Sequence, residues 1–264
     1  MKVFGINLGY KNVAKAGNIQ GCSDSSLESI MGRKSRELEM MENDAQARKE
    51  YREPKKKERK PLEAKTEAQA HYIMGIEANT LTFGVGPAGT GKTYICTRIG
   101  AKLLDEKRIS RLVVTRPAVE AGGGLGFLPG TIHEKFAPYF APFRDVLEDY
   151  FGKSHVEYLI KTGAIEIQPL EYIRGLTFDD AFVILDEAQN TTPGQMKLFL
   201  SRIGNYSRVV VNGDVTQKDI DGVSGLEDAM DRLEGLKGVG IIEFDEDDIV
   251  RSGICKEIMK RYRI

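Results

Sequence analysis

The stretch that decides the fold of this chain reads Gly86-Pro87-Ala88-Gly89-Thr90-Gly91-Lys92-Thr93. An apolar run at 81–85 enters it and an amphipathic segment beginning at Tyr94 leaves it, so the predicted order is strand, glycine loop and helix. Glycines allow backbone angles that other residues adopt only at a cost, so successive N–H groups can turn inward around an anion. The pattern therefore predicts a cradle for the phosphates of a nucleotide.

Two side chains at the end of the loop predict how the phosphates are held. Lys92 would reach the β- and γ-phosphates, and the Thr93 hydroxyl would hold Mg²⁺. The helix that begins there would direct the positive end of its dipole at the same point. The alternative is a glycine-rich turn without this role, but the flanking strand and helix favour the functional interpretation. We therefore expect a nucleotide and Mg²⁺ as ligands, with residues 86–93 contacting the nucleotide.

A second apolar run, at 181–185, ends in two acids, Asp186 and Glu187. A central parallel strand would deliver both to the carboxyl edge of the sheet, where open α/β sheets bind ligands. We expect Asp186 to hold Mg²⁺ directly or through a water, and Glu187 to orient or deprotonate the attacking water. Two exposed acids at a strand end are the alternative, and the glycine loop argues against it.

Two glutamines are further candidates for the site. Gln217 follows a third apolar run at 209–211, and would reach the γ-phosphate or its water from the same edge of the sheet. Gln69 lies near the start of a helix that Thr66 is expected to cap. A side-chain amide offers a donor and an acceptor together and can read adenine, so we expect Gln69 to contact the base. An ordinary surface residue is the alternative.

The rest of the chain predicts an α/β fold with a mostly parallel sheet and helices on both faces. Further strands are expected at 112–117, 165–170 and 241–244, and helices at 94–107, 194–203 and 252–262. A glycine-rich break at 122–126 precedes eight aromatic residues between Phe127 and Tyr158. The prolines that interrupt this segment predict short helices instead of one long helix; they are Pro129, Pro138 and Pro142. The aromatic residues are expected in the core, with a partner surface or a base-stacking platform as the alternative.

Composition limits the classes of function. The 264 residues carry a net charge of −1, so no global basic field indicates a polyanion partner, and any nucleic-acid binding must be local. The three cysteines, Cys22, Cys96 and Cys255, have no metal-ligand spacing and predict free thiols in a reducing compartment. Neither a membrane-spanning run nor a signal peptide is recognisable, so we expect a cytoplasmic protein.

The first part of the chain is expected to form a charged, partly ordered N-terminal extension, residues 1–61, ahead of a domain at 62–264. Between residues 33 and 67 there are twelve Lys/Arg and nine Asp/Glu, a local balance of +3 (12 − 9). The basic core of this segment is Lys55-Lys56-Lys57-Glu58-Arg59-Lys60. It is either a solvated helix or linker, or an arm that contacts phosphate backbones.

A set of motifs in unbroken order gives the chain a specific resemblance. Besides the glycine loop, the motifs are Thr115-Arg116-Pro117-Ala118-Val119-Glu120-Ala121-Gly122, Leu125-Gly126-Phe127-Leu128-Pro129-Gly130, Leu185-Asp186-Glu187-Ala188-Gln189-Asn190-Thr191-Thr192-Pro193 and Gly213-Asp214-Val215-Thr216-Gln217. Together they resemble the PhoH-like P-loop ATPases over roughly residues 62–264. The resemblance implies a RecA-like fold, similar to the first motor domain of superfamily-one helicases. It also implies ATP hydrolysis coupled to RNA unwinding or remodelling, and assembly into rings, commonly hexamers.

The resemblance also implies roles for single residues. Lys92 and Thr93 match the phosphate and Mg²⁺ positions, the pair 186–187 matches the acids, Gln217 matches the γ-phosphate sensor, and Gln69 matches the adenine-reading glutamine. The first 60 residues depart from the better-known members and are too short for the nuclease domain that some members carry. RNA cleavage is therefore not expected.

A superfamily-one helicase takes a catalytic arginine from its second motor domain, and such an arginine is worth about 10³–10⁵ in rate. This chain is expected to obtain it from a neighbouring subunit, with Arg251 as first candidate and Arg174 and Arg202 as alternatives.

An ATP-driven motor acting on single-stranded RNA is the leading hypothesis. The rival hypotheses are a nucleotide-switched scaffold with slow ATPase activity and a small-molecule kinase. A carboxylate directly after Asp186 suits hydrolysis by water better than phosphate transfer to a small molecule, which argues against the kinase.

Overall fold

The computed structural model describes residues 61–117, 132–173 and 175–250, together with residues 253, 254 and 261. Several predictions fall on other parts of the chain and lie outside the described residues: the extension at 1–60, the glycine run at 122–126, Pro129, Arg174, Arg251 and most of the helix expected at 252–262. The division of the chain at residue 61 stays a prediction.

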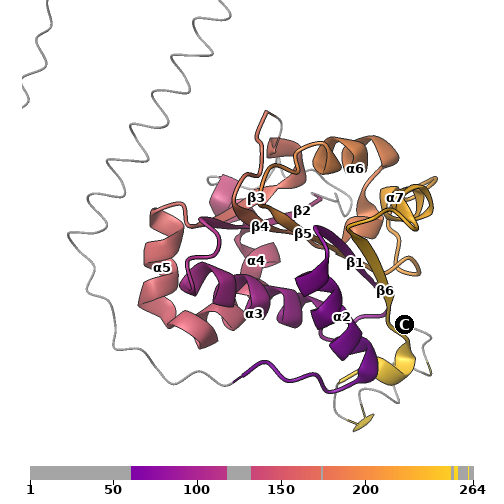
Figure 1. Cartoon of the computed structure of the whole chain (residues 1–264), viewed down its shortest axis with the longest axis horizontal. Coiled ribbons are helices and arrows are strands. Elements are labelled where there is room, and N and C mark those ends of the chain that lie inside the picture. The colour runs from indigo at the N-terminus through magenta and orange to yellow at the C-terminus, as the bar shows by residue number, and fades with distance from the viewer. Residues whose placement is uncertain (1–60, 118–131, 174, 251–252, 255–260, 262–264) are drawn as a thin grey trace, which may run out of the picture. The chain divides into compact units, whose positions relative to one another are not determined.

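Six strands form one sheet in which every neighbouring pair is parallel (Figure 1). In chain order they are β1 (Leu81–Val85), β2 (Arg111–Arg116), β3 (Ile165–Pro169), β4 (Ala181–Leu185), β5 (Arg208–Gly213) and β6 (Val239–Glu243). Across the sheet the order is β3-β2-β4-β5-β1-β6. Every residue of β1 and β4 is buried, as continuous apolar runs require when a sheet is covered on both faces. The predicted strands are confirmed, with ends that differ by a few residues.

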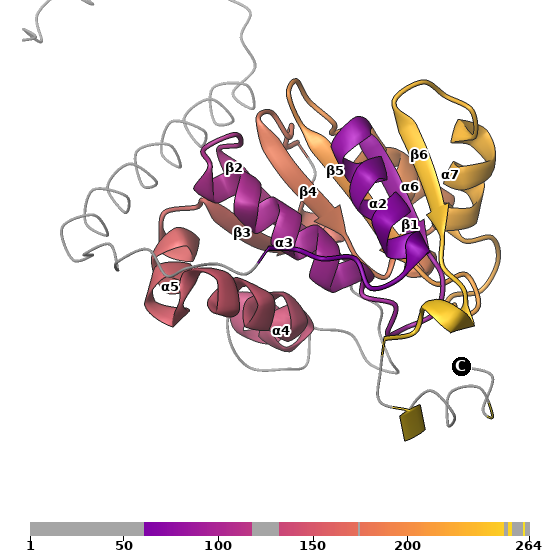
Figure 2. The same ribbon diagram turned by 60° about the horizontal axis from the view of Figure 1, so that its bottom comes forward.

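Helices cover both faces of this sheet, which confirms the predicted α/β architecture (Figure 2). One face carries α2 (Glu67–Ala78), α3 (Lys92–Asp105), α4 (Ile132–Phe151) and α5 (Lys153–Lys161), and the other carries α6 (Pro193–Leu200) and α7 (Gly225–Leu233). Side chains alternate between two cores: in β4, Phe182 and Ile184 belong to the first, and Val183 and Leu185 to the second. Within the described residues, no helix is long and apolar enough to cross a bilayer.

The parallel arrangement places the predicted site at one edge of the sheet. Because all strands run the same way, β1, β4 and β5 end side by side, with Val85 paired to Gly213 and Leu185 paired to Val211. The segments that follow these strands are the glycine loop, the acids beginning at Asp186, and the turn that contains Gln217. Residues far apart in the sequence therefore meet at the carboxyl edge.

The prolines of the aromatic segment do not break it into short helices, and that prediction was wrong. Pro138 and Pro142 lie inside α4, a single helix of 20 residues. Both prolines are exposed, while Phe140 and Phe143 on the other side of the helix are buried. Core burial thus outweighs the cost of proline. Four aromatic residues of α4 predicted for the core are confirmed there, whereas Tyr139 is exposed; the four are Phe140, Phe143, Tyr150 and Phe151.

Replacing Phe143 with alanine tests whether burial holds α4 in place. Phe143 is 1% exposed, so Phe143→Ala is expected to lower the free energy of unfolding by about 3–5 kcal/mol. Urea denaturation measures the change. Tyr206→Ala is the matched control, because Tyr206 is 91% exposed and its loss should cost less than about 0.5 kcal/mol. Equal losses in the two variants would contradict this account of α4.

Candidate nucleotide-binding site

The glycine loop joins β1 to α3 and takes a shape that requires glycine. Gly86, Gly89 and Gly91 have φ values of +142°, +88° and +89°. A Cβ added at Gly86 would collide with the backbone carbonyl of Phe244, and one at Gly91 would lie 2.9 Å from Nε2 of Gln69. α3 begins immediately after Gly91. The predicted order of strand, loop and helix is confirmed, and the loop leaves room for an anion at the start of α3.

Lys92 lies along the loop, where its ammonium group donates to main-chain oxygens. Its Nζ is 2.6 Å from the carbonyl oxygen of Gly86 and 2.8 Å from that of Pro87. Burial lowers the pKa of Lys92, while the carboxylates of Asp214 and Asp186 act in the opposite direction. A phosphate oxygen is a stronger acceptor than a carbonyl for a charged donor, so this ammonium group is well placed to bind one.

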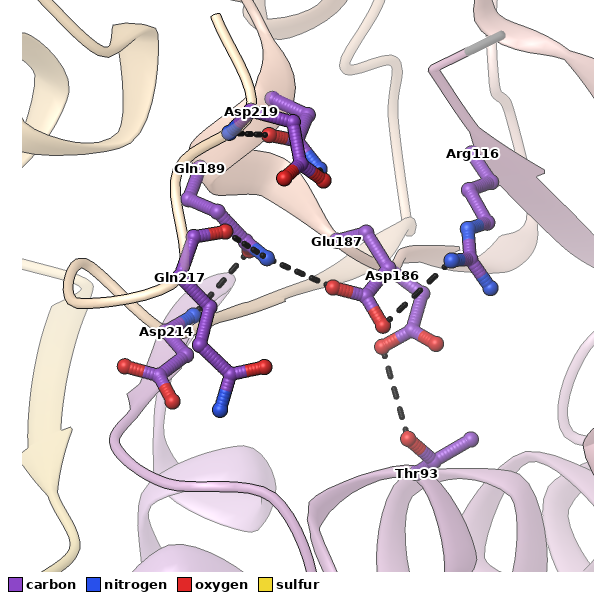
Figure 3. A network of polar contacts seen from close by, with 9 residues as sticks. Thr93, Arg116, Asp186, Glu187, Gln189, Asp214, Gln217 and Asp219 are labelled. Atoms are coloured by element: carbon purple, nitrogen blue, oxygen red, sulfur yellow. Dashed lines mark hydrogen bonds and ion pairs between the residues drawn. The ribbon is translucent and has the colours of Figure 1, made fainter. Parts of the chain in front are cut away.

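Thr93 and Asp186 face each other across the carboxyl edge of the sheet (Figure 3). Thr93 Oγ1 lies 3.4 Å from Asp186 Oδ1. Burial and the negative charge of Glu187 raise the pKa of Asp186 to about 6, against the lowering influence of Arg116 and Lys92. A bound cation would favour the ionised form of such a carboxylate. Hydroxyl and carboxylate oxygens are the ligands that Mg²⁺ prefers, so these residues fit a magnesium ion.

Glu187 follows Asp186 in a left-handed backbone conformation, with φ of +55°. Its two carboxylate oxygens have different partners: Gln189 Nε2 donates to Oε2 at 2.6 Å, and Arg116 Nη2 lies 3.5 Å from Oε1 (Figure 3). A left-handed conformation is uncommon for a residue with a side chain, and such residues recur at functional sites as well as in turns. Glu187 lines the same pocket as the phosphate loop, so the structure brings the predicted base next to that loop.

Gln217 and Asp214 come from the segment after β5 and complete a pocket of about 280 Å³ that Lys92, Thr93 and Glu187 also line. Among the described residues, the buried Nε2 of Gln217 and Oδ2 of Asp214 have no hydrogen-bond partner. A buried polar atom without a partner is costly, and a phosphate, its metal or a water molecule would supply one. Figure 3 shows the two side chains next to each other.

Gln69 contacts the phosphate loop itself. Its Nε2 donates to the carbonyl oxygen of Thr90 at 2.8 Å, and its Oε1 accepts from the backbone N–H of Lys65 at 2.8 Å. The side chain is 4% exposed, so the alternative of an ordinary surface residue was wrong. Both ends of the amide are bonded to the backbone in this arrangement, and Gln69 supports the loop. Contact with adenine stays a prediction.

Substitution of Gln69 separates these two roles. Gln69→Ala is expected to weaken binding of ATP and GTP equally, by about tenfold, because losing a buried hydrogen bond costs about 1–1.5 kcal/mol. Titration with fluorescent analogues of both nucleotides measures the affinities. Gln69→Glu keeps the shape but loses the donor to Thr90, and should show a similar loss. A loss confined to ATP would indicate that Gln69 reads the base instead.

A chain of buried hydrogen bonds lies behind the loop and was missing from the sequence prediction. The Tyr72 hydroxyl donates to Asn212 Oδ1, and Asn212 Nδ2 lies 3.3 Å from Cys96 Sγ. All three residues are 0% exposed. Burial raises the pKa of Cys96 to about 12, so the thiol stays protonated at neutral pH. Cys96 is a free cysteine, as predicted, and it links α3 to α2 and β5.

Of the arginines predicted to act on a neighbouring subunit, only Arg202 belongs to the described residues. It follows α6, and its carbonyl oxygen accepts from the backbone N–H of Phe178 at 2.8 Å. These segments precede β5 and β4, so Arg202 lies at the amino edge of the sheet, opposite the pocket of its own chain. Its buried Nε has no hydrogen-bond partner in the described part of the chain.

The all-parallel sheet, the glycine loop with its Lys-Thr pair after β1, and the acid pair after β4 define a P-loop NTPase with a RecA-like fold. The family can also be stated. The chain belongs to the PhoH-like family, because the sequence model of that family, described as PhoH-like protein, matches residues 61–263. This confirms the resemblance found in the sequence.

Three relatives show the extent of the similarity. The chain is 49% identical over 205 residues to a PhoH-like protein of Bacillus subtilis (strain 168), covering 77% of this chain and 64% of the relative. It is also 49% identical to Protein PhoH of Escherichia coli (strain K12) and to a PhoH-like protein of Mycobacterium tuberculosis (strain ATCC 25618 / H37Rv), covering 76% and 77% of this chain and 58% of each relative. The chain thus spans about three fifths of the length of these relatives.

A solved structure, the UvsW helicase from bacteriophage T4, resembles this chain more distantly. The match covers 71% of this chain and 62% of the helicase chain, with a TM-score of 0.46 and 13% sequence identity. A likeness at this level is too weak to support an inference about function.

Proposed function

We propose that this protein binds and hydrolyses ATP in the presence of Mg²⁺. The observation that carries the proposal is the meeting of the phosphate loop, the Thr93–Asp186 pair and Glu187 at one edge of the sheet, with the unpartnered amide of Gln217 beside them. This combination supplies groups for phosphate, for metal and for water.

Each residue has a distinct task in the proposed reaction. Lys92 and the N–H groups of the loop bind the β- and γ-phosphates, while Thr93 and Asp186 would hold Mg²⁺, which neutralises charge that develops on the phosphates. Glu187 accepts a proton from the attacking water or orients it. The Gln217 amide bonds to the γ-phosphate or to that water. A carboxylate next to the metal-binding acid favours hydrolysis over transfer to a small-molecule acceptor.

The finer part of the proposal is a cytoplasmic motor that acts on single-stranded RNA as a ring, commonly a hexamer, and unwinds or remodels it. The family resemblance supports it, and in a ring the catalytic arginine would come from a neighbouring subunit. Arg251 is the first candidate for this role, with Arg174 and Arg202 as alternatives. Arg251→Ala is expected to lower turnover while nucleotide binding is kept, and unchanged turnover would exclude Arg251.

ATP turnover with and without single-stranded RNA tests the motor against its rival, a nucleotide-switched scaffold with slow ATPase. The motor predicts several-fold activation by RNA that is lost in Lys92→Ala, and the scaffold predicts none. Measuring the mass in solution, with and without ATP and Mg²⁺, tests ring formation. A well-folded protein that stays monomeric and fails to bind or hydrolyse ATP would overturn the whole proposal.

A further inference from the structure

Arg116 is the last residue of β2 and lies next to the predicted catalytic acids. β2 pairs with β4 so that Thr115 lies opposite Leu185, and the backbone N–H of Asp186 donates to the Thr115 carbonyl oxygen at 3.0 Å. This register places the Arg116 side chain beside Glu187, where Nη2 lies 3.5 Å from Oε1 (Figure 3). The contact therefore follows from strand pairing and is not a chance meeting of surface side chains.

The second oxygen of Glu187 is held by a buried side chain. Gln189, which donates to it, is 2% exposed, and the Gln189 Oε1 accepts from the backbone N–H of Asp214 at 3.1 Å. Gln189 thus connects Glu187 to the segment after β5. With Arg116 on the other oxygen, the carboxylate of Glu187 is restrained from two sides. The direction in which it faces the pocket depends on both partners.

The guanidinium group of Arg116 is itself restrained. It lies over the ring of Tyr139 in α4, with 5.3 Å between Cζ and the ring centroid. The side chain of Arg116 is 26% exposed, so it is more enclosed than a typical surface arginine. Arg116 is also absent from the residues that line the nucleotide pocket, whereas Glu187 is among them. The contact that links Arg116 to the pocket is its ion pair with Glu187.

We propose that Arg116 is a positioning residue that fixes the carboxylate of Glu187 for attack on ATP, with Tyr139 holding the guanidinium group in the required plane. This inference rests on the proposed ATP hydrolysis. Misplacing a reacting group by about 1 Å can cost about 100-fold in rate, so loss of this restraint is expected to act on turnover and not on binding. Arg116 thereby couples catalysis at the pocket to the placement of α4.

A double-mutant cycle tests the inference. Arg116→Ala is expected to lower kcat by about 10–100-fold at saturating Mg²⁺, with the Kd for ADP unchanged within about twofold. In a Glu187→Gln background, single-turnover hydrolysis should show no further loss, because Arg116 acts through the carboxylate that is already missing. Arg116→Lys keeps the charge but loses the planar fork, so its kcat should be intermediate.

One matched control and one further variant complete the test. Arg111 lies at the start of the same strand and pairs with Glu166 at 3.0 Å, so Arg111→Ala removes a similar ion pair far from the pocket and should leave kcat unchanged. Tyr139→Ala removes the aromatic face beside Arg116 and should lower kcat several-fold. Thermal unfolding verifies that each variant is folded, and the lysine variant replaces Arg116→Ala if that protein is unstable.

Several results would overturn the inference alone. One is an unchanged kcat in Arg116→Ala, and another is a large rise in its Kd for ADP. A third is a fall in the single-turnover rate that adds to the fall caused by Glu187→Gln. The last is recovery of kcat by excess Mg²⁺, which would show that Arg116 acts through Asp186. Absence of turnover in the wild-type protein would instead overturn the proposed function. The two failures are therefore distinguishable.

Discussion

Replacing Lys92 with alanine is expected to abolish measurable ATP turnover, with a fall of at least about 100-fold. Among the described residues, its ammonium group is the cation that lines the pocket, and it bonds to the carbonyl oxygens of Gly86 and Pro87 in the loop. Without it, the negative charge that develops on the phosphates has one fewer preorganised donor. A coupled assay of phosphate release measures the loss, and titration with a fluorescent ATP analogue measures the accompanying fall in affinity.

A lysine elsewhere in the same helix provides the control for this variant. Lys102 also belongs to α3, but its side chain is 61% exposed and its nearest acid, Glu106, is 4.0 Å away. Lys102→Ala should therefore leave turnover within about twofold of the wild type, because exposed pairs of this kind contribute little. If Lys92→Ala retained wild-type turnover, the loop would not be the site of phosphate binding, and the proposed function would be wrong.

The parts of the fold that could be predicted are those with signals local in the sequence. The strand 81–85 is a continuous apolar run, and the spacing of the glycines after it specifies a loop before any tertiary contact is known. Asp186, Glu187 and Gln217 could be placed at one edge because parallel strands end together. The N-cap at Thr66 is confirmed, since its side chain accepts from the backbone N–H of Gln69.

The residues that escaped prediction depend on contacts between distant segments. Gln189 and Asp214 are joined by a hydrogen bond although they lie 25 residues apart in the sequence, and no periodic pattern predicts such a contact. The hydrogen bond from Gln69 to Thr90 also had no signal in the sequence, because it depends on how α2 packs beside the loop. α7 could have been recognised, because Ser224 and Glu227 form a capping box whose spacing is visible in the sequence.

Glu187→Gln is expected to lower turnover by about 10²–10⁴-fold while ATP stays bound. Glutamine keeps the shape of the side chain and can still accept the hydrogen bond from Gln189, but it cannot take a proton from water. The phosphate loop and the Thr93–Asp186 pair are unaltered by the change. Equilibrium titration with ATP should therefore show wild-type affinity, and single-turnover hydrolysis should show the loss.

A carboxylate with a similar environment provides the control for Glu187→Gln. Glu166 in β3 also pairs with an arginine, Arg111, and its side chain is 17% exposed, so Glu166→Gln removes an equivalent charge away from the pocket and should leave turnover within about twofold. Wild-type turnover in Glu187→Gln would mean that another group accepts the proton. Asp214 would then be the candidate, because its buried Oδ2 has no partner among the described residues and the residue lines the same pocket.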